Sequence, residues 1–278
     1  MELRCPVCGE TLSLTAKSYL CRNRHTFDLS ASGYTNLSRR PNISGDNAEM
    51  AAARYRFLQK DHYRFLKEKI REMAVSCGAA HCVDLACGEG YYTSVLPGER
   101  IGVDLSSASL RKAAKRDPEG RYFLASIFSL PLFDTSCDFV LTCFAPRADA
   151  EIFRILQEGG SFLFVLPAAD HLWELKEVLY PSVYPNKDQP QTPEGFALVK
   201  HELISKSALL QKEELQDLFR MTPYAYHTPR EAKEKLFALE ELKVRFSFSL
   251  YLYQKSSSAG SSLTGSAGTL SSQGQAEV

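Results

Sequence analysis

The sequence has no run of 18 apolar residues, and its first eight residues lack the apolar core of a secretory signal. We therefore expect neither a membrane span nor export. Charge of one sign is not in excess either, because 33 Lys and Arg stand against 33 Asp and Glu. No bulk field exists to attract nucleic acid. We expect a cytoplasmic protein whose partners include neither a membrane nor DNA.

Two phosphate-binding motifs are also missing. No glycine is followed by Lys-Ser or Lys-Thr, which excludes a P-loop. Gly88-Glu89-Gly90 is followed by Tyr91-Tyr92, so the third glycine of a dinucleotide fingerprint is absent as well. A cofactor without a pyrophosphate therefore fits this glycine turn best.

A nucleoside-binding crevice is nevertheless indicated around the turn. An apolar strand at residues 81–85 leads into it, and a second strand at 101–105 carries Asp104 near its end. The stretch from Asp84 to Gly90 resembles the D-x-G-C-G-x-G motif of S-adenosylmethionine-dependent methyltransferases. Ala86 takes the place of the first glycine, a change that costs little where φ is negative.

This resemblance implies a set of cofactor contacts. Asp104 is expected to bind the ribose hydroxyls, Asp84 to position the loop or reach the amino group through water, and Ser126 to flank the adenine. The predicted contacts in this part of the chain are Asp84, Cys87, Gly88, Glu89, Gly90, Asp104 and Ser126. The alternative is an ordinary strand–turn–helix without a ligand.

The cysteine spacing near the N-terminus predicts a metal centre. Cys5-x2-Cys8 is followed by Cys21-x3-His25, two close pairs that suit a tetrahedral Zn²⁺ site. Four protein ligands leave no open coordination position, so we assign Zn²⁺ a structural role. The other cysteines have no paired spacing and are expected to pack as small apolar side chains.

Apolar periodicity predicts an α/β fold with a parallel core. Strands are expected at residues 81–85, 101–105, 121–125, 138–143, 161–166, 196–205 and 243–254, and helices at 46–73, 107–116, 148–156, 212–220 and 229–239. We predict a Rossmann-like mixed seven-stranded sheet of the class I methyltransferase type with an N-terminal zinc-binding module. The predicted divisions are a zinc and RNA-recognition module (1–40), a linker and helical segment (41–79), the methyltransferase domain (80–255) and a disordered Ser/Gly-rich tail (256–278).

The order of unusual sequence segments is similar to that of the RlmA family of bacterial ribosomal RNA guanine-N1 methyltransferases. The matching segments are the Cys and His pairs, residues 27–37, residues 45–58, His62-Tyr63, residues 84–93, Phe144-Ala145-Pro146 and residues 171–176. The resemblance implies that Tyr63, Gly88, Glu89 and His171 contact the cofactor, and that the Cys and His pairs hold zinc. Taken alone, Tyr63 reads as a packing residue and His171 as a cap or surface imidazole.

The implied reaction transfers a methyl group from S-adenosylmethionine to N1 of a guanine in a hairpin loop of 23S ribosomal RNA. The proton on N1 must leave, but the sequence does not identify a catalytic base. Residues 143–146 lack the Asn/Asp-Pro-Pro-aromatic motif of amino-directed DNA methyltransferases, which argues against an exocyclic amine as acceptor. The resemblance also implies a homodimer and, for some members, macrolide resistance.

Two other functions are open on the sequence. One is a methyltransferase for a small molecule, which needs neither a zinc module nor the local basic excess of residues 1–72, with 13 Lys and Arg against 8 Asp and Glu. The other is a non-catalytic RNA-binding zinc protein, against which the intact glycine turn and Asp104 argue. Under the preferred interpretation, metal removal is expected to abolish RNA modification but to spare cofactor binding.

Overall fold

The computed structural model describes residues 1–38 and 48–256. The linker expected at 41–45 lies outside these residues, and so does the tail expected at 256–278 apart from Ser256. At the N-terminus, a small antiparallel sheet is built from β1 (Leu3–Arg4), β2 (Thr11–Leu14), β3 (Ser18–Cys21) and β4 (Thr26–Asp28). In the described part of the chain, no helix combines the length and hydropathy needed to cross a bilayer.

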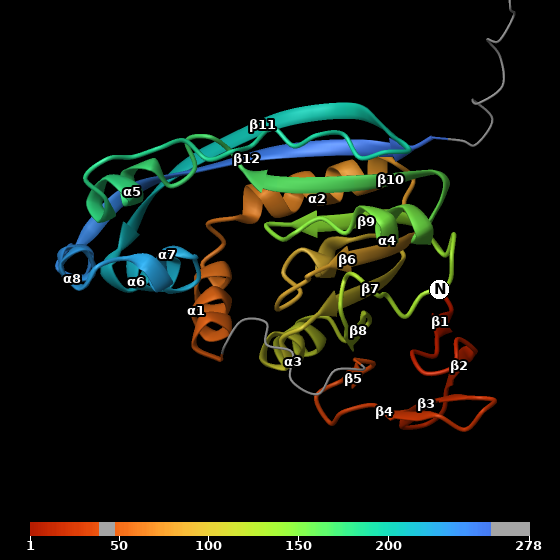
Figure 1. The fold of residues 1–278 in the computed structure, drawn as a ribbon. Helices are drawn as coiled ribbons and strands as arrows, with labels where there is room; N and C mark the ends of the chain where they lie inside the picture. The colour runs from red at the N-terminus through yellow and green to blue at the C-terminus, as the bar shows by residue number, and fades with distance from the viewer. Residues whose placement is uncertain (39–47, 257–278) are drawn as a thin grey trace, which may run out of the picture.

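A second sheet forms the centre of the molecule. Its strands are β5 (Tyr34–Asn36), β6 (His81–Leu85), β7 (Glu99–Asp104), β8 (Arg121–Leu124), β9 (Cys137–Cys143), β10 (Leu156–Pro167), β11 (Phe196–Gln211) and β12 (Glu241–Lys255). They lie in the order β11-β12-β10-β9-β6-β7-β8-β5 (Figure 1). The middle pairs are parallel, whereas β12 runs antiparallel to both β10 and β11.

The mixed sheet is confirmed, but it has eight strands where the sequence predicted seven. The extra strand is β5, which leaves the N-terminal module and pairs in parallel with β8 at the edge of the sheet. Three residues are too short a run for alternation to reveal a strand. As a result, the module is joined to the central sheet by backbone hydrogen bonds.

The helices largely follow the prediction. They are α1 (Ala48–Gln59), α2 (Arg64–Ser76), α3 (Ser107–Arg116), α4 (Asp149–Ile155), α5 (Trp173–Leu179), α6 (Lys212–Arg220), α7 (Tyr224–His227), α8 (Arg230–Phe237) and the short 3-10 helix η1 (Thr93–Val95). The single helix predicted at 46–73 is wrong, because the chain turns between Gln59 and Arg64. Asp61 has a φ of 58° there, and the Tyr63 ring packs on Phe246 and Phe248 of β12. Burial of that ring outweighs helix propensity.

Alternating strand residues supply two cores, one on each face of the central sheet. Phe139 and Leu141 of β9 pack with α2, α5 and α6 on one face, while Val140 lies on the other. The second face is covered by α4 and by the N-terminal module, whose Tyr19 ring packs edge-on against Phe123 of β8 at 5.6 Å. Because alternate residues of each strand face opposite sides of the sheet, the sheet has two apolar faces, one covered by α2, α5 and α6 and the other by α4 and the N-terminal module.

Candidate functional site

The four predicted zinc ligands come together at one end of the N-terminal module. Their ligand atoms all lie within 4.8 Å of one another. Cys8 Sγ is 3.7 Å from Cys21 Sγ, and His25 Nδ1 is 3.4 Å from Cys21 Sγ and 3.6 Å from Cys5 Sγ. A tetrahedron with Zn–S bonds of about 2.3 Å has edges of roughly 3.8 Å, so the cluster fits one Zn²⁺ ion bound through Nδ1.

Backbone groups around the cluster favour thiolates. Hydrogen bonding from the backbone at Glu10 is the main reason why the pKa of Cys8 falls to about 6. Burial raises the pKa of Cys5, which a bound dication would oppose. In this module the chain can therefore supply anionic sulfur at neutral pH.

The metal-binding loop is anchored to the central domain. The Arg4 amide donates to the Pro131 carbonyl at 2.9 Å, and Leu3 forms a β-bridge with Leu132. Leu3 and Leu132 are both fully buried. The loop that carries Cys5 and Cys8 is thus held against the segment that follows β8.

The glycine turn lies at the topological switch point of the sheet. From β6 the chain proceeds to β7 and β8 on one side, while β9 and β10 lie on the other. In such sheets a ligand-binding crevice opens at the carboxyl ends of the two strands that flank this point. Here those ends are Leu85 of β6 and Cys143 of β9, so the crevice lies between the glycine turn and the loop after β9.

Three residues of the turn have positive φ: Ala86 at 59°, Gly88 at 56° and Gly90 at 74°. A Cβ on Gly90 would lie 3.0 Å from Ala113 of α3, which explains why glycine is needed there. Among the described residues, a Cβ on Gly88 would have only Arg54 within 4 Å, so the structure leaves space beside this residue. Alanine was expected from the sequence to cost little at position 86 if its φ were negative. The φ is positive, so Ala86 holds a strained left-handed conformation.

Three carboxyl groups surround the turn: Asp84 and Glu89 are buried, and Asp104 is partly buried. Asp104 accepts from the Gly88 amide at 2.9 Å and from the Ser106 amide at 2.7 Å. Asp84 accepts from the Thr93 hydroxyl. Burial raises the pKa of Asp84 to about 7 and also raises the pKa values of Glu89 and Asp104. A cationic ligand would bring these carboxyl groups back to the charged form.

Sequence reasoning missed Arg54 as a residue of this site. It projects from α1, and its Nη1 lies 3.9 Å from the position of a Cβ on Gly88. Its charge lowers the pKa values of Glu89 and Asp104, against the larger effect of burial. Arg54 could have been suspected from the sequence because it lies in the 45–58 segment, which is one of the segments that carry the family resemblance. Packing of α1 over the turn could not be read from that segment.

Tyr63 and His171, 108 positions apart in the sequence, lie together near the crevice. Their ring centroids are 6.4 Å apart, and both rings pack on Phe248. His171 accepts a hydrogen bond from the Ser247 amide through Nδ1, and burial lowers its pKa to about 3. His171 is therefore neutral at physiological pH, with Nδ1 already in use, and is not a proton acceptor.

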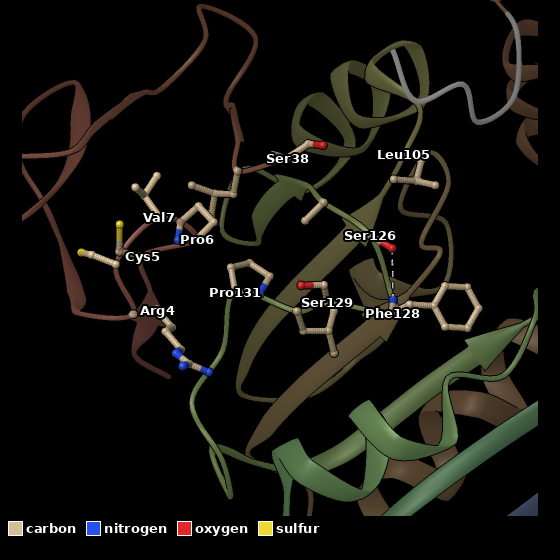
Figure 2. Close-up of a pocket in the computed structure, with 15 residues that line it drawn as sticks. Arg4, Cys5, Pro6, Val7, Ser38, Leu105, Ser126, Phe128, Ser129 and Pro131 are labelled. Carbon is tan, nitrogen blue, oxygen red and sulfur yellow. Dashed lines mark hydrogen bonds between the residues drawn. The ribbon is translucent and has the colours of Figure 1, made fainter. Parts of the chain in front are cut away.

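The side chains of two other predicted cofactor contacts, Cys87 and Ser126, point to different surroundings. The Cys87 side chain packs with Leu110, Ala113 and Tyr122 beneath the turn, so only its backbone remains for a cofactor. Ser126 follows β8, and its hydroxyl accepts from the Phe128 amide at 3.2 Å (Figure 2). It lines a cavity that the metal-binding loop also borders.

This cavity has a volume of about 980 Å³ and lies between the module and the central domain (Figure 2). Leu105 and Ser126, which follow β7 and β8, line one side, and Arg4 and the loop from Cys5 to Gly9 line the other. Phe128 and Val7 also border the cavity and have exposed side chains. The loop that carries the metal ligands Cys5 and Cys8 therefore forms one side of the cavity in which Ser126 marks the predicted adenine position.

Comparisons with known proteins cover both parts of the chain. Residues 3–38 match the family described as the N-terminal zinc ribbon of RlmA, and residues 83–164 match a methyltransferase domain family. The 23S rRNA (guanine(748)-N(1))-methyltransferase of Streptomyces fradiae is 34% identical over an alignment of 240 positions that covers 81% of this chain and 86% of the relative. YxjB of Bacillus subtilis strain 168, whose name places it in the same rRNA (guanine-N1)-methyltransferase class, is 30% identical over 86% of this chain and 91% of its own length.

One solved structure is also similar to this chain. The crystal structure of YcgJ protein from Bacillus subtilis has a TM-score of 0.43 at 19% identity and covers 68% of this chain and 99% of that chain.

Proposed function

The chain belongs to the RlmA family of 23S rRNA (guanine-N1)-methyltransferases, and we propose that it methylates the guanine equivalent to position 748 named for the Streptomyces fradiae relative. The observation that carries this proposal is that one chain matches both the zinc ribbon and the methyltransferase domain and aligns with 86% of the Streptomyces fradiae relative. A small-molecule methyltransferase would need no zinc ribbon at its N-terminus.

S-adenosylmethionine, when bound, supplies a methyl group on a positively charged sulfur. The residues of the crevice suit each part of this molecule. Asp104 would accept from the ribose hydroxyls, and Arg54 would pair with the carboxylate beside Gly88. Asp84 and Glu89 supply negative charge that offsets the ammonium and sulfonium groups. Ser126 and Leu105 would border the adenine.

The zinc module is proposed to hold the RNA hairpin against the central domain. Arg4 faces the cavity beside the metal loop, and Lys17, Arg22 and Arg24 lie on the same module. Arg22 already pairs with Glu10 at 2.6 Å, so the other cations are the better candidates for phosphate contacts. The family resemblance further implies a homodimer in the cytoplasm and a link to macrolide susceptibility.

Reverse transcription of ribosomal RNA tests this function, because a methyl group at N1 blocks base pairing. We expect a stop at the guanine equivalent to position 748 in cells that contain the protein, and read-through when the gene is deleted. Re-expression of the wild-type chain should restore the stop, whereas an Asp104→Ala variant should not. A stop that persists after deletion would sink the proposal.

A further inference from the structure

The loop after β9 begins with a residue in a strained conformation. Phe144 has a φ of 56°, although it is neither glycine nor asparagine. Such backbone costs about 1–3 kcal/mol and is usually retained at functional sites. The Phe144 amide is fixed by a hydrogen bond to the Val165 carbonyl at 3.0 Å, and its ring is 40% exposed. The chain thus maintains an open aromatic surface at the switch point.

A second feature is the buried hydroxyl of Tyr92, whose ring packs against the Phe144 ring. The side chain is 8% exposed, and the hydroxyl has no hydrogen-bond partner among the residues that the structure describes. An orphaned buried donor costs about 1–3 kcal/mol, so its retention points to a ligand. The pKa of Tyr92 is raised well above 10, chiefly by burial and then by Cys143, so the hydroxyl stays protonated and can donate.

These two residues meet each other on the β9 side of the crevice. The rings of Tyr92 and Phe144 are 6.3 Å apart, and Phe144 continues onto Phe248 at 5.3 Å. The Gly88 turn and Asp104 occupy the β6 and β7 side. The proposed ribose contact is on that side, so we expect a methyl acceptor to approach from the side of Phe144.

We infer that Phe144 and Tyr92 form the binding site for the flipped-out guanine, with the purine stacked on the Phe144 ring and the Tyr92 hydroxyl donating to guanine O6. This inference rests on the proposed function. Aromatic stacking holds an unstacked base regardless of its identity. A donor at O6 favours guanine over adenine, which carries an amino group at that position.

The same hydrogen bond would assist the reaction. Methylation forms an N1–carbon bond, breaks the methyl–sulfur bond with its electron pair left on sulfur, and releases the N1 proton to water. As N1 loses its proton, negative charge spreads onto O6, where a donor stabilises it. Neutral His171 cannot take the proton through Nδ1, which the Ser247 amide occupies. Tyr92 is thus assigned to charge stabilisation and Phe144 to positioning.

Matched variants separate this role from a structural one. Phe144→Leu keeps the backbone strain but removes the ring, and its control is Phe153→Leu, an equally exposed ring on α4. Tyr92→Phe removes the orphaned hydroxyl, and its control is Tyr251→Phe, a similarly buried tyrosine whose hydroxyl donates to the Asp188 carbonyl at 2.6 Å. Each protein is assayed for cofactor affinity, thermal midpoint and methylation of a synthetic hairpin that contains the target guanine.

We expect Phe144→Leu to raise KM for the hairpin about 5- to 150-fold, the equivalent of ~1–3 kcal/mol of base stacking. Phe144→Trp should restore most of the affinity. Tyr92→Phe should lower kcat about 100-fold without lowering the thermal midpoint. With 6-thioguanosine at the target, wild type should slow, whereas Tyr92→Phe should show no further loss. Cofactor affinity should stay within about twofold of wild type throughout.

Two results would overturn the inference. If wild type methylates guanine N1 but Phe144→Leu and Tyr92→Phe match their controls, the acceptor binds elsewhere while the proposed function stands. If wild type binds S-adenosylmethionine but leaves guanine N1 unmodified, the proposed function fails and the inference fails with it.

Discussion

Two buried side chains of the crevice titrate in opposite senses. Burial raises the pKa of Asp84 from 3.8 to about 7 and lowers the pKa of His171 from 6.5 to about 3. Asp84 holds a proton in the folded state that the unfolded chain releases, so its contribution to stability is lost as pH rises from about 4 to 7. The contribution of His171 is lost as pH falls from about 6.5 to 3. Between these limits the two effects oppose each other.

Asp84→Asn should remove the contribution of Asp84 to the pH dependence of stability and leave that of His171. Relative to wild type, the free energy of unfolding of the variant should increase by about 1.4 kcal/mol per pH unit between pH 4 and 7, because only wild type takes up a proton on folding, and this uptake becomes less favourable as pH rises. Urea unfolding at several pH values measures this difference. His171→Asn should show the opposite trend relative to wild type. A difference that does not change with pH would mean that Asp84 titrates normally in the folded protein.

Residues with a local sequence signal could be predicted, and residues placed by packing could not. Asp84, Asp104 and the glycines follow from the spacing of one strand, one turn and the next strand. Arg54 and Tyr92 are placed by packing alone, because α1 brings Arg54 beside Gly88 and the Tyr92 ring contacts the Phe144 ring. Ala86 was identified as a substituted glycine, but its positive φ depends on the path of the turn.

At the scale of elements, five of the seven predicted strands have boundaries within two positions of those observed, whereas β10 begins five residues earlier and β11 ends six residues later than predicted. The break between α1 and α2 was not predictable, because it follows from burial of Tyr63 against β12. The pairing of β5 with β8 was not predictable either, since short edge strands are set by tertiary contacts. The β5–β8 pairing and the cavity between the module and the central domain change the expectation that metal removal spares cofactor binding.

Metal removal is now expected to weaken cofactor binding as well as RNA modification. The loop from Cys5 to Gly9 lines the same cavity as Ser126 and Leu105. If the loop loses its conformation without the metal, the predicted adenine position becomes exposed to solvent. We predict a loss of cofactor affinity of roughly 3- to 10-fold, corresponding to about 0.7–1.4 kcal/mol, in a Cys8→Ser variant. Titration calorimetry measures it, with Cys77→Ser as control because Cys77 lies outside the metal cluster. Unchanged affinity in Cys8→Ser would favour the sequence-based expectation.

At the scale of the molecule, the N-terminal module and the central domain share one apolar core. Leu12 and Tyr19 of the small sheet belong to the same buried cluster as Val103, Phe123 and Phe162 of the large one. Residues 1–38 therefore have little core of their own, and the metal and the shared core have to stabilise them together. The division at residue 40 remains a prediction about function, while the packing argues for one folding unit.

A shared core predicts one cooperative thermal transition and a metal effect that reaches distant parts of the chain. Trp173, the single tryptophan, lies at the start of α5 on the opposite face of the sheet from the module. Free zinc at 100 times its Kd contributes about 2.7 kcal/mol, so a chelator should lower the midpoint by roughly 5–10 °C. Trp173 fluorescence and calorimetry should report the same midpoint with and without chelator. If the module melts separately and the Trp173 midpoint does not move, the two parts fold independently and the shared cluster contributes little to their coupling.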